Sequence, residues 1–272
     1  MFPVEDDEKR NELRAGFDQA AEAYQRTRPV LPPGLFDDLT HVAGLGRGDR
    51  VAEIGCGTGQ ATVPLAERGL AVTAVELGAS LAAVARRRLA AFPSARVITS
   101  SFEDWEPEGA PFDAVTAFCS LHWIEPRLRY RKPAGLLRPG SALCVAGCPW
   151  ARPAGGERFW TGVQQDYRAV GYTGDPPPPP EQIGPWHFPA EATAFFEEVA
   201  SLRYPFSVVY SAEDYLAILA TQSGTHALGE TLSAEFLSRV HDRLESLKMS
   251  QLTVTFVALL TIGRRRSTDP AS

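Results

Sequence analysis

The chain has 272 residues and a formal net charge of −6 at pH 7. A single hydrophobic core stops growing near ~250–300 residues, so we expect one domain over residues 1–272. Hydrophobic residues make up 44% of the chain and charged residues 22%, which excludes wholesale disorder. The acidic balance disfavours a nucleic-acid partner, because phosphate binding draws on clustered Lys and Arg.

The cysteines and the hydropathy pattern disfavour two further classes of protein. The four cysteines include no C-x-x-C pair and have no His at zinc-finger spacing, so we expect no metal site. No apolar run reaches the ~18 residues of a membrane span, and residues 1–10 lack the apolar stretch of a signal peptide. We therefore expect a cytoplasmic protein with reduced cysteines and no membrane partner; its oligomeric state stays open.

Residues 1–45 are predicted to form two helices. From Phe17 to Tyr24, apolar residues recur at steps of three and four, as on one face of a helix. Arg28-Pro29 ends this pattern, because the residue before a proline avoids helical backbone angles. A second helix is predicted over residues 34–42.

An alternation of strands and helices begins at residue 50. The predicted strands are 50–54, 71–75, 96–99, 113–118 and 142–146, and the predicted helices are 61–68, 79–91 and one that ends at 134–137. Short strands that alternate with helices of this length predict a parallel, doubly wound α/β sheet. We expect residues 50–146 to be its cofactor-binding core.

The alternation breaks after Pro149. Five prolines at 176–180 predict an extended polyproline II connector that cannot join a helix. Beyond it we predict strands over 202–210 and 252–262 and helices over 212–219 and 233–247, with Ser211 as an N-cap. We expect residues 150–250 to cap the site and bind substrate, and residues 252–263 to be the last strand.

A glycine loop follows the first of these strands, in the segment Val51-Ala-Glu-Ile-Gly-Cys-Gly-Thr-Gly-Gln60. Its glycines permit a tight turn and let a ligand approach the backbone. The spacing G-x-G-x-G differs from the dinucleotide pattern G-x-G-x-x-G, and Glu53 would repel a pyrophosphate but attract an ammonium group. Glu76 ends the next strand about 20 residues later, where an acid can accept the hydroxyls of a ribose.

This combination of a glycine loop and two acids resembles the class I SAM-dependent methyltransferases, in their small-molecule branch. The resemblance covers roughly residues 17–146. It implies a Rossmann-like, seven-stranded, mostly parallel sheet with one antiparallel edge strand, together with N-terminal lid helices and a helical cap. It implies S-adenosyl-L-methionine as the cofactor, with the ribose on Glu76 and the amino-acid end near Glu53.

Further cofactor contacts follow from the resemblance one position at a time. Phe102 or Glu103, after the third strand, would meet the adenine, and Cys119 would lie beside the methionine end. Tyr24 on the lid helix can approach the cofactor carboxylate, although packing roles for Tyr24 and Phe102 stay open. The full prediction comprises Tyr24, Glu53, Gly55, Cys56, Gly57, Gly59, Glu76, Leu77, Phe102, Glu103 and Cys119.

The acceptor side carries a weaker pattern. His122 follows the fourth strand, at the carboxyl edge where doubly wound folds bind ligands. It is a candidate general base, and the alternative is a structural histidine packed on Trp123. The candidate substrate residues are Arg28, His122, Trp123, Trp186 and His187; a core role for the aromatic members stays open.

The reaction predicted from these residues is methyl transfer to a small organic acceptor. Transfer to oxygen or carbon is favoured over nitrogen, because the Asn/Asp-Pro-Pro-Tyr/Phe motif of many amide and adenine methyltransferases is absent after the fourth strand. One alternative is an NAD(P)-dependent oxidoreductase, which Glu53, the glycine spacing and the lack of a Tyr-x-x-x-Lys pair disfavour. Another is a protein that binds the cofactor without catalysis.

Overall fold

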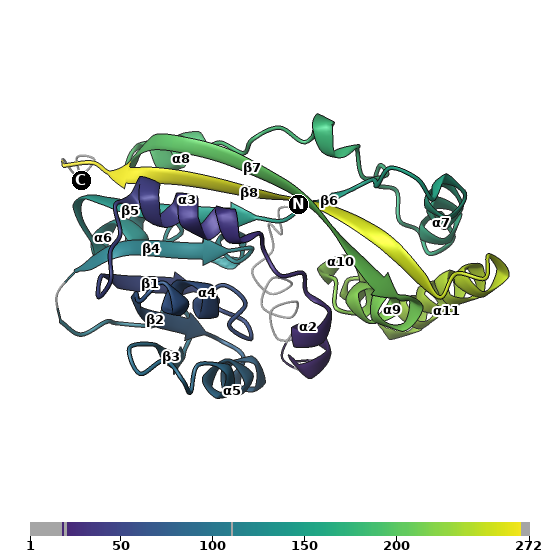
Figure 1. The fold of residues 1–272 in the computed structure, drawn as a ribbon, viewed down its shortest axis with the longest axis horizontal. Helices are drawn as coiled ribbons and strands as arrows, with labels where there is room; N and C mark the ends of the chain where they lie inside the picture. The colour runs from purple at the N-terminus through teal and green to yellow at the C-terminus, as the bar shows by residue number, and fades with distance from the viewer. Residues whose placement is uncertain (1–17, 19–20, 110, 268–272) are drawn as a thin grey trace.

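A single mixed β-sheet organises the protein (Figure 1). The computed structural model describes residues 18, 21–109 and 111–267. The strands are β1 Arg50–Ile54, β2 Ala71–Glu76, β3 Arg96–Thr99, β4 Phe112–Phe118, β5 Leu137–Gly147, β6 Trp150–Ala151, β7 Phe196–Ser211 and β8 Gln251–Arg265. They lie in the order β3-β2-β1-β4-β5-β8, and β6 and β7 also pair with β8.

The strand directions confirm the predicted doubly wound sheet. The strands β1 to β5 pair in parallel, whereas β8 runs antiparallel to β5, β6 and β7. The reversed strand expected over 252–262 is therefore β8, and β7 lies outside it. The strand count is eight because the chain forms the two-residue strand β6 just after β5.

Helices cover both faces of the sheet. They are α2 Ala21–Thr27, α3 Pro33–Ala43, α4 Thr62–Glu67, α5 Ala79–Arg88, η1 Leu121–Trp123, α6 Arg131–Leu136, α7 Glu157–Ala169, η2 Pro180–Gln182, α8 Ala190–Thr193, α9 Ala212–Ala220, α10 Ser223–His226 and α11 Glu230–Ser246. The helices α3, α4, α5, α6, α9 and α11 lie within a few residues of the predicted bounds, whereas α7, α8, α10, η1 and η2 were not predicted. The core residues of α3, α4 and α5 pack on one face, and those of α6 and α8 on the other. The predicted helix start at Phe17 lies outside the described residues.

A second hydrophobic core forms at the end of the sheet. The strands β7 and β8 extend past β5 as a two-stranded ribbon, and α7, α9, α10 and α11 gather there (Figure 1). We call these four helices and the ribbon ends beneath them the cap lobe. Its core includes Phe159, Tyr215 and Phe236. The Arg243 guanidinium donates to the Asp166 carboxylate at 2.9 Å and joins α11 to α7.

The segment around α2 connects the sheet domain to the cap lobe. On the sheet side, Asp18 Oδ1 accepts hydrogen bonds from the backbone amides of Ser80 (2.7 Å) and Leu81 (2.9 Å) in the first turn of α5. On the cap side, Arg26 pairs with Asp214 of α9 at 2.9 Å. The short helix α2 therefore lies between α5 of the sheet domain and α9 of the cap lobe (Figure 1).

Two predictions for residues 176–210 need correction. Pro180 begins the 3₁₀ helix η2, because a proline at the first helical position gives up no hydrogen bond. The strand expected from residue 202 begins at Phe196. Its pairing with β8 continues on both sides of Pro205, which lies opposite Val257. A proline is tolerated there because β7 is an outer strand that bonds β8 alone.

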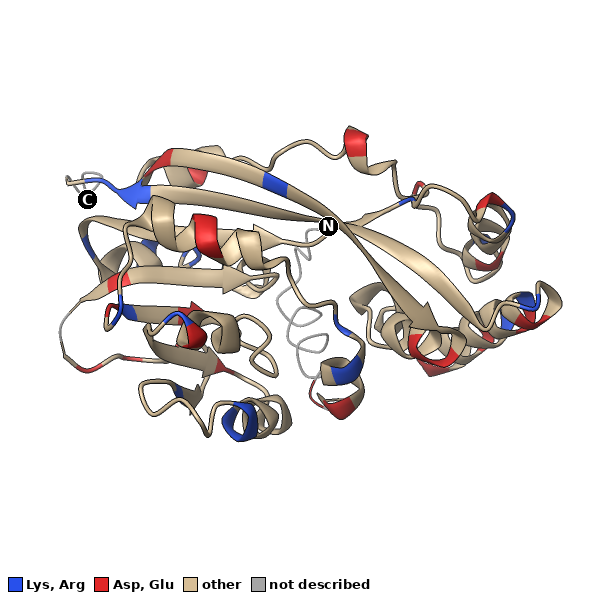
Figure 2. Ribbon diagram, in the orientation of Figure 1, with Lys and Arg blue, Asp and Glu red and all other residues tan. Residues whose placement is uncertain are grey.

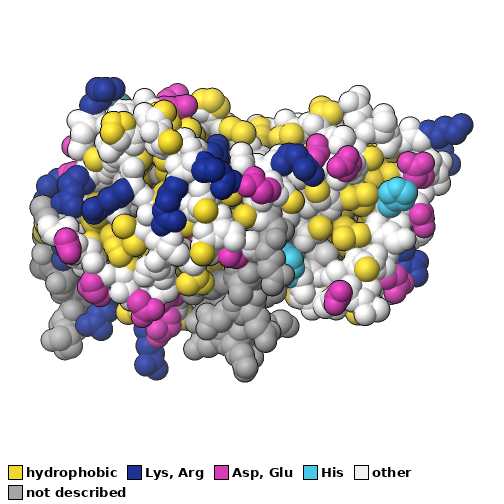
Figure 3. Space-filling model, turned by 90° about the horizontal axis from the view of Figure 1, so that it is seen from below, with side chains coloured by type: hydrophobic (Ala, Val, Ile, Leu, Met, Phe, Trp, Pro, Cys, Tyr) yellow, Lys and Arg dark blue, Asp and Glu magenta, His cyan; other side chains and the backbone are white. Residues whose placement is uncertain are grey.

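Charges of both signs are spread over the sheet domain and the cap lobe (Figure 2). The space-filling view from below shows both acidic and basic side chains on the visible surface (Figure 3). Among the described residues, no helix combines the length and the apolar character that crossing a membrane requires.

Candidate functional site

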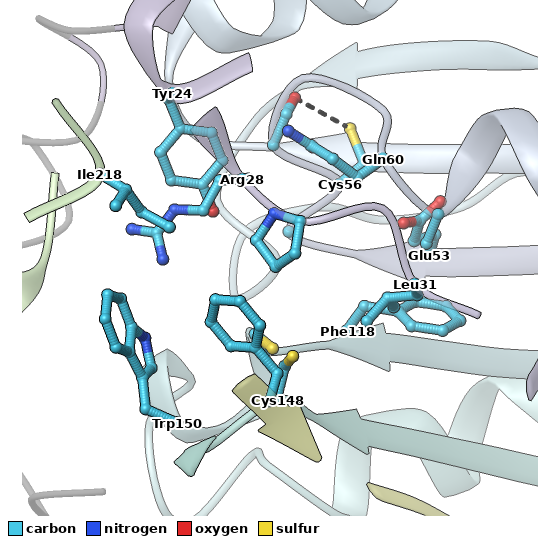
Figure 4. Close-up of a pocket in the computed structure, with 16 residues that line it drawn as sticks. Tyr24, Arg28, Leu31, Glu53, Cys56, Gln60, Phe118, Cys148, Trp150 and Ile218 are labelled. Atoms are coloured by element: carbon cyan, nitrogen blue, oxygen red, sulfur yellow. Dashed lines mark hydrogen bonds between the residues drawn. The ribbon is translucent and has the colours of Figure 1, made fainter. Parts of the chain in front are cut away.

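A pocket opens where the strand order of the sheet reverses, between β1 and β4. In doubly wound folds ligands bind at this reversal, outside the carboxyl ends of the strands. The pocket encloses about 680 Å³ of empty space, part of it open to solvent. Its lining residues are Tyr24, Arg28, Pro29, Leu31, Glu53, Gly55, Cys56, Gly57, Gln60, Ala61, Phe118, Cys119, Cys148, Trp150, Ile218 and Phe256 (Figure 4).

The glycine loop forms one wall of this pocket and requires its glycines. Gly55, Gly57 and Gly59 have φ values of 63°, 57° and 83°, which side-chain-bearing residues rarely adopt. A Cβ atom on Gly55 would stand 2.7 Å from the Cβ of Ser120. The Gly55 amide also donates to the Val75 carbonyl at 2.8 Å. The loop is therefore folded tightly across the ends of β1, β2 and β4.

Glu53 places a buried carboxyl group beneath the glycine loop. Its side chain is 1% exposed, and its Oε2 has no hydrogen-bond partner in the described part of the chain. Burial raises the pKa of Glu53 to about 7; the Thr62 hydroxyl opposes this rise, and Glu76 adds to it. A buried carboxyl oxygen that lacks a donor is a site for a ligand that brings a positively charged donor.

Glu76 organises the turn beside the glycine loop. Its carboxylate accepts hydrogen bonds from the Gly57 amide at 2.7 Å and from the Gly78 amide at 2.9 Å. Leu77, which lies between Glu76 and Gly78 in the chain, is 42% exposed. Glu76 therefore ties β2 to the loop and presents an acceptor at the position predicted to hold a ribose.

The two residues predicted to meet an adenine lie outside the pocket. Phe102 is buried in the core, with its ring centroid 6.2 Å from that of Trp105. Glu103 accepts a hydrogen bond from the Glu125 amide at 3.2 Å. The structure therefore gives Phe102 a packing role and ties the Glu103 side chain to the chain after η1.

His122 lies in η1, three residues after the lining residue Cys119, and is not itself in the lining of the pocket. Its ring centroid is 4.7 Å from that of Trp123, as in the packed alternative. Burial and the nearby Arg129 guanidinium lower the pKa of His122 to about 4. The imidazole is consequently neutral at physiological pH and is a weak proton acceptor.

Arg28 brings a positive charge to the opposite wall of the pocket. Its guanidinium carbon lies 4.5 Å from the centroid of the Tyr24 ring, and one amino group donates to the Thr221 carbonyl at 2.7 Å. Figure 4 shows the guanidinium directed toward Ile218 and Trp150, away from Glu53. Burial raises the pKa of the Tyr24 hydroxyl, and Arg28 opposes that rise.

Trp186 and His187, two of the predicted substrate residues, are not in the lining of this pocket. The Trp186 carbonyl accepts a hydrogen bond from Ser201, and His187 Nδ1 lies 2.6 Å from Glu198 Oε1. These bonds hold the segment along β7. Of this aromatic cluster, Phe188 packs in the core on the side of the sheet that carries α8, and the Trp186 ring centroid lies 5.6 Å from that of Phe188.

Several lining residues were not predicted, namely Pro29, Leu31, Gln60, Ala61, Phe118, Cys148, Trp150, Ile218 and Phe256. Three of these had a usable signal. Gln60 and Ala61 directly follow the last loop glycine, and Trp150 follows the fifth strand at the same sheet edge. Ile218 and Phe256 had none, because only the fold of the cap lobe brings them here.

The chain matches a known family model over part of its length. Residues 51–140 match the model described as a methyltransferase domain. An uncharacterized methyltransferase of Mycobacterium tuberculosis is 34% identical over 134 residues, which cover 49% of this chain and 52% of that protein. The chain thus spans about half the length of that relative.

Two further similarities extend over more of the chain. A trans-aconitate 2-methyltransferase of Delftia acidovorans is 25% identical over 242 residues, 82% of this chain and 86% of that protein. The solved structure of a putative type II methyltransferase from Anaeromyxobacter dehalogenans superposes with a TM-score of 0.62 at 24% identity, over 87% of this chain and 97% of that one. This second likeness establishes the fold.

Proposed function

We propose that the chain, in which residues 51–140 match a methyltransferase domain, is a class I SAM-dependent methyltransferase that transfers a methyl group from S-adenosyl-L-methionine to a small organic acceptor. The buried Glu53 carboxyl, whose Oε2 lacks a donor beside the glycine loop, carries the proposal. A cationic amino-acid end of the cofactor would supply that donor and offset the burial of the carboxylate.

The core over residues 50–146 fits this cofactor through three features. The bare backbone of Gly55 and Gly57 allows close approach, Glu53 faces the pocket, and Glu76 stands at the end of β2 as a hydroxyl acceptor. Bound there, S-adenosyl-L-methionine supplies a methyl group already activated by its sulfonium, which an acceptor takes by in-line displacement. The residues of the chain then act mainly by holding the two reactants in line and by excluding water.

The acceptor would occupy the space between α2, the end of β5 and the cap lobe. Trp150, Ile218 and Phe256 give this side an apolar wall. The pocket lies at the carboxyl edge of the sheet, where doubly wound folds bind small ligands. The name of the Delftia acidovorans relative, a trans-aconitate 2-methyltransferase, supports a small-molecule acceptor as well. Oxygen and carbon are the atoms we favour for methylation.

Two measurements test this function. Calorimetry should detect S-adenosylhomocysteine binding to the wild-type protein and no comparable binding of NADH. Glu53→Gln should weaken S-adenosylhomocysteine binding, and Glu67→Gln, at an exposed position in α4, is the matched control. Protein incubated with methyl-labelled cofactor and a metabolite extract should label a small molecule. Tight NADH binding would favour an oxidoreductase, and cofactor binding without any labelled product would favour a binding protein.

A further inference from the structure

The pocket carries opposite charges on its two sides. The carboxyl of Glu53 lies at the glycine-loop side, with Glu76 just behind that loop. The guanidinium of Arg28 lies at the cap side, between Ile218 and Trp150 (Figure 4). A ligand that fills the pocket therefore meets negative charge at one end and positive charge at the other.

The contacts of Arg28 hold it in place without neutralising it. The Tyr24 ring supports the guanidinium from one side, and the Thr221 carbonyl accepts one of its five N–H groups. Its Nε is buried and has no hydrogen-bond partner in the described part of the chain. Among those residues no carboxylate lies within ion-pair distance of the Arg28 guanidinium. Arg26, two residues earlier in the chain, pairs with Asp214.

The charge of Arg28 also affects a titratable group of the cap lobe. Burial lowers the pKa of His226, in α10 of the cap lobe, and Arg28 lowers it further. The Arg28 guanidinium is thus a fixed, partly desolvated cation directed at an otherwise apolar wall. Such a fork of donors binds a carboxylate in preference to a neutral group of the same shape.

We propose that Arg28 determines acceptor specificity by binding an anionic group, a carboxylate in the first instance, on a small acceptor whose apolar part packs against Trp150, Ile218 and Phe256. This inference rests on the proposed function and adds the substrate class. The anionic group serves to bind the acceptor, and the proposal does not specify which atom of the acceptor is methylated. Arg28 acts through binding and takes no proton, because a guanidinium stays protonated at all working pH values.

A competing role for Arg28 would be to bind the carboxylate of the cofactor itself. Two ligands separate these roles: S-adenosylhomocysteine, and S-adenosyl-3-thiopropylamine, which lacks only the carboxylate. We expect Arg28→Met to change the affinity for both ligands by less than threefold. Arg28→Met that weakens S-adenosylhomocysteine tenfold or more, while sparing the decarboxylated analogue, would assign Arg28 to the cofactor and overturn the proposal.

The acceptor arm uses protein saturated with S-adenosylhomocysteine and a panel of aliphatic and aromatic carboxylic acids with their primary amides. Wild-type protein should bind at least one acid tenfold or more tighter than its amide, and Arg28→Met should remove that preference. Arg28→Lys should retain part of it, since it keeps the charge and loses the fork. Arg239→Met is the matched control, because Arg239 pairs with Glu235 on the exposed face of α11.

The outcomes separate failure of this inference from failure of the proposed function. Wild-type protein that binds S-adenosylhomocysteine but binds no acid more tightly than its amide overturns the Arg28 proposal and leaves methyl transfer standing. Wild-type protein that does not bind S-adenosylhomocysteine overturns the proposed function. Retained circular dichroism and melting temperature in Arg28→Met would exclude misfolding as the cause of any loss.

Discussion

The carboxylate of Glu76 accepts a hydrogen bond of 2.7 Å from the backbone amide of Gly57, so the end of β2 holds the glycine loop that follows β1. The same carboxylate accepts a second bond from the Gly78 amide. One acid thereby sets the shape of the two turns at which a nucleoside would bind. This dual role makes Glu76 a sensitive position for mutation.

Glu76→Ala should weaken S-adenosylhomocysteine binding by roughly 1–3 kcal/mol, the scale of a lost charge-assisted hydrogen bond. It removes the proposed ribose acceptor and frees the Gly57 amide, so the loss should exceed that of Glu76→Gln, which keeps one oxygen. Calorimetry on both variants and on Glu67→Gln as control measures this. Unchanged affinity in Glu76→Ala would remove Glu76 from the cofactor site.

Glu53 should make cofactor binding depend on pH. With a pKa of about 7, raised by burial, the carboxyl is largely protonated at pH 6. A bound ammonium group favours the ionised form, so S-adenosylhomocysteine binding should release a proton near pH 6.5 and tighten as pH rises through 7. Calorimetry in buffers of different ionisation enthalpy counts that proton. Binding to Glu53→Gln should be weaker and independent of pH in this range; an equal proton release in that variant would contradict the assignment.

The same group should affect stability in the opposite direction. The folded protein holds the Glu53 proton up to about pH 7, whereas the unfolded chain loses it near the ordinary value of 4.5. Its contribution is therefore fully present below pH 4.5 and is lost as pH rises through 7, by up to about 3 kcal/mol. Denaturant unfolding of wild type and Glu53→Gln at pH 5 and 8 should show the difference between the two proteins growing toward pH 8 in favour of the variant.

Gly55→Ala should destabilise the fold by about 2–4 kcal/mol. Alanine is strained at a φ of 63°, and its Cβ would stand 2.7 Å from the Cβ of Ser120. Ser120→Gly removes that contact, so the double variant should lose less stability than the two single losses added together. Gly34→Ala is the control, because its new Cβ meets nothing within 4 Å in α3. Urea unfolding measures all four; strict additivity would show that strain alone, and not the contact, sets the cost.

Gly78→Ala should displace the Asp18 carboxylate from the first turn of α5. A Cβ on Gly78 would stand 2.6 Å from Asp18 Oδ1, the oxygen that accepts from the Ser80 and Leu81 amides. We expect a loss of about 1 kcal/mol, the value of an N-cap, and a similar loss for Asp18→Ala. The double variant should cost little more than either single one. Gly135→Ala, with open space around its new Cβ, is the control; fully additive losses would mean that the two residues do not act together.

The parts of the fold that were predictable depend on short-range patterns. The strands β1, β2 and β4 are buried on both faces over most of their length, so their continuous apolar runs mark them without knowledge of their neighbours. The cap lobe and the segment over 176–195 depend on contacts between residues far apart in the chain. Trp186 is held by Ser201 and Thr261, and Asp18 caps a helix 62 residues later. No local spacing encodes such pairs, so the position of Trp186 along β7 and the Asp18 contact could not be predicted from the sequence.

The pH dependence of the rate distinguishes a catalytic role of His122 from a packing role. Burial and Arg129 lower its pKa to about 4, so its charge should not change between pH 6 and 9. If His122 only packs against Trp123, His122→Asn should alter turnover and cofactor affinity together, and the wild-type rate should show no inflection from a histidine near pH 6.5. If His122 is a base, the variant should lose turnover tenfold or more at unchanged S-adenosylhomocysteine affinity. We expect the first result, since a group with a pKa of about 4 takes protons poorly from a neutral hydroxyl. Steady-state rates from pH 5 to 9 on both proteins, with labelled cofactor and an accepted substrate, distinguish these outcomes.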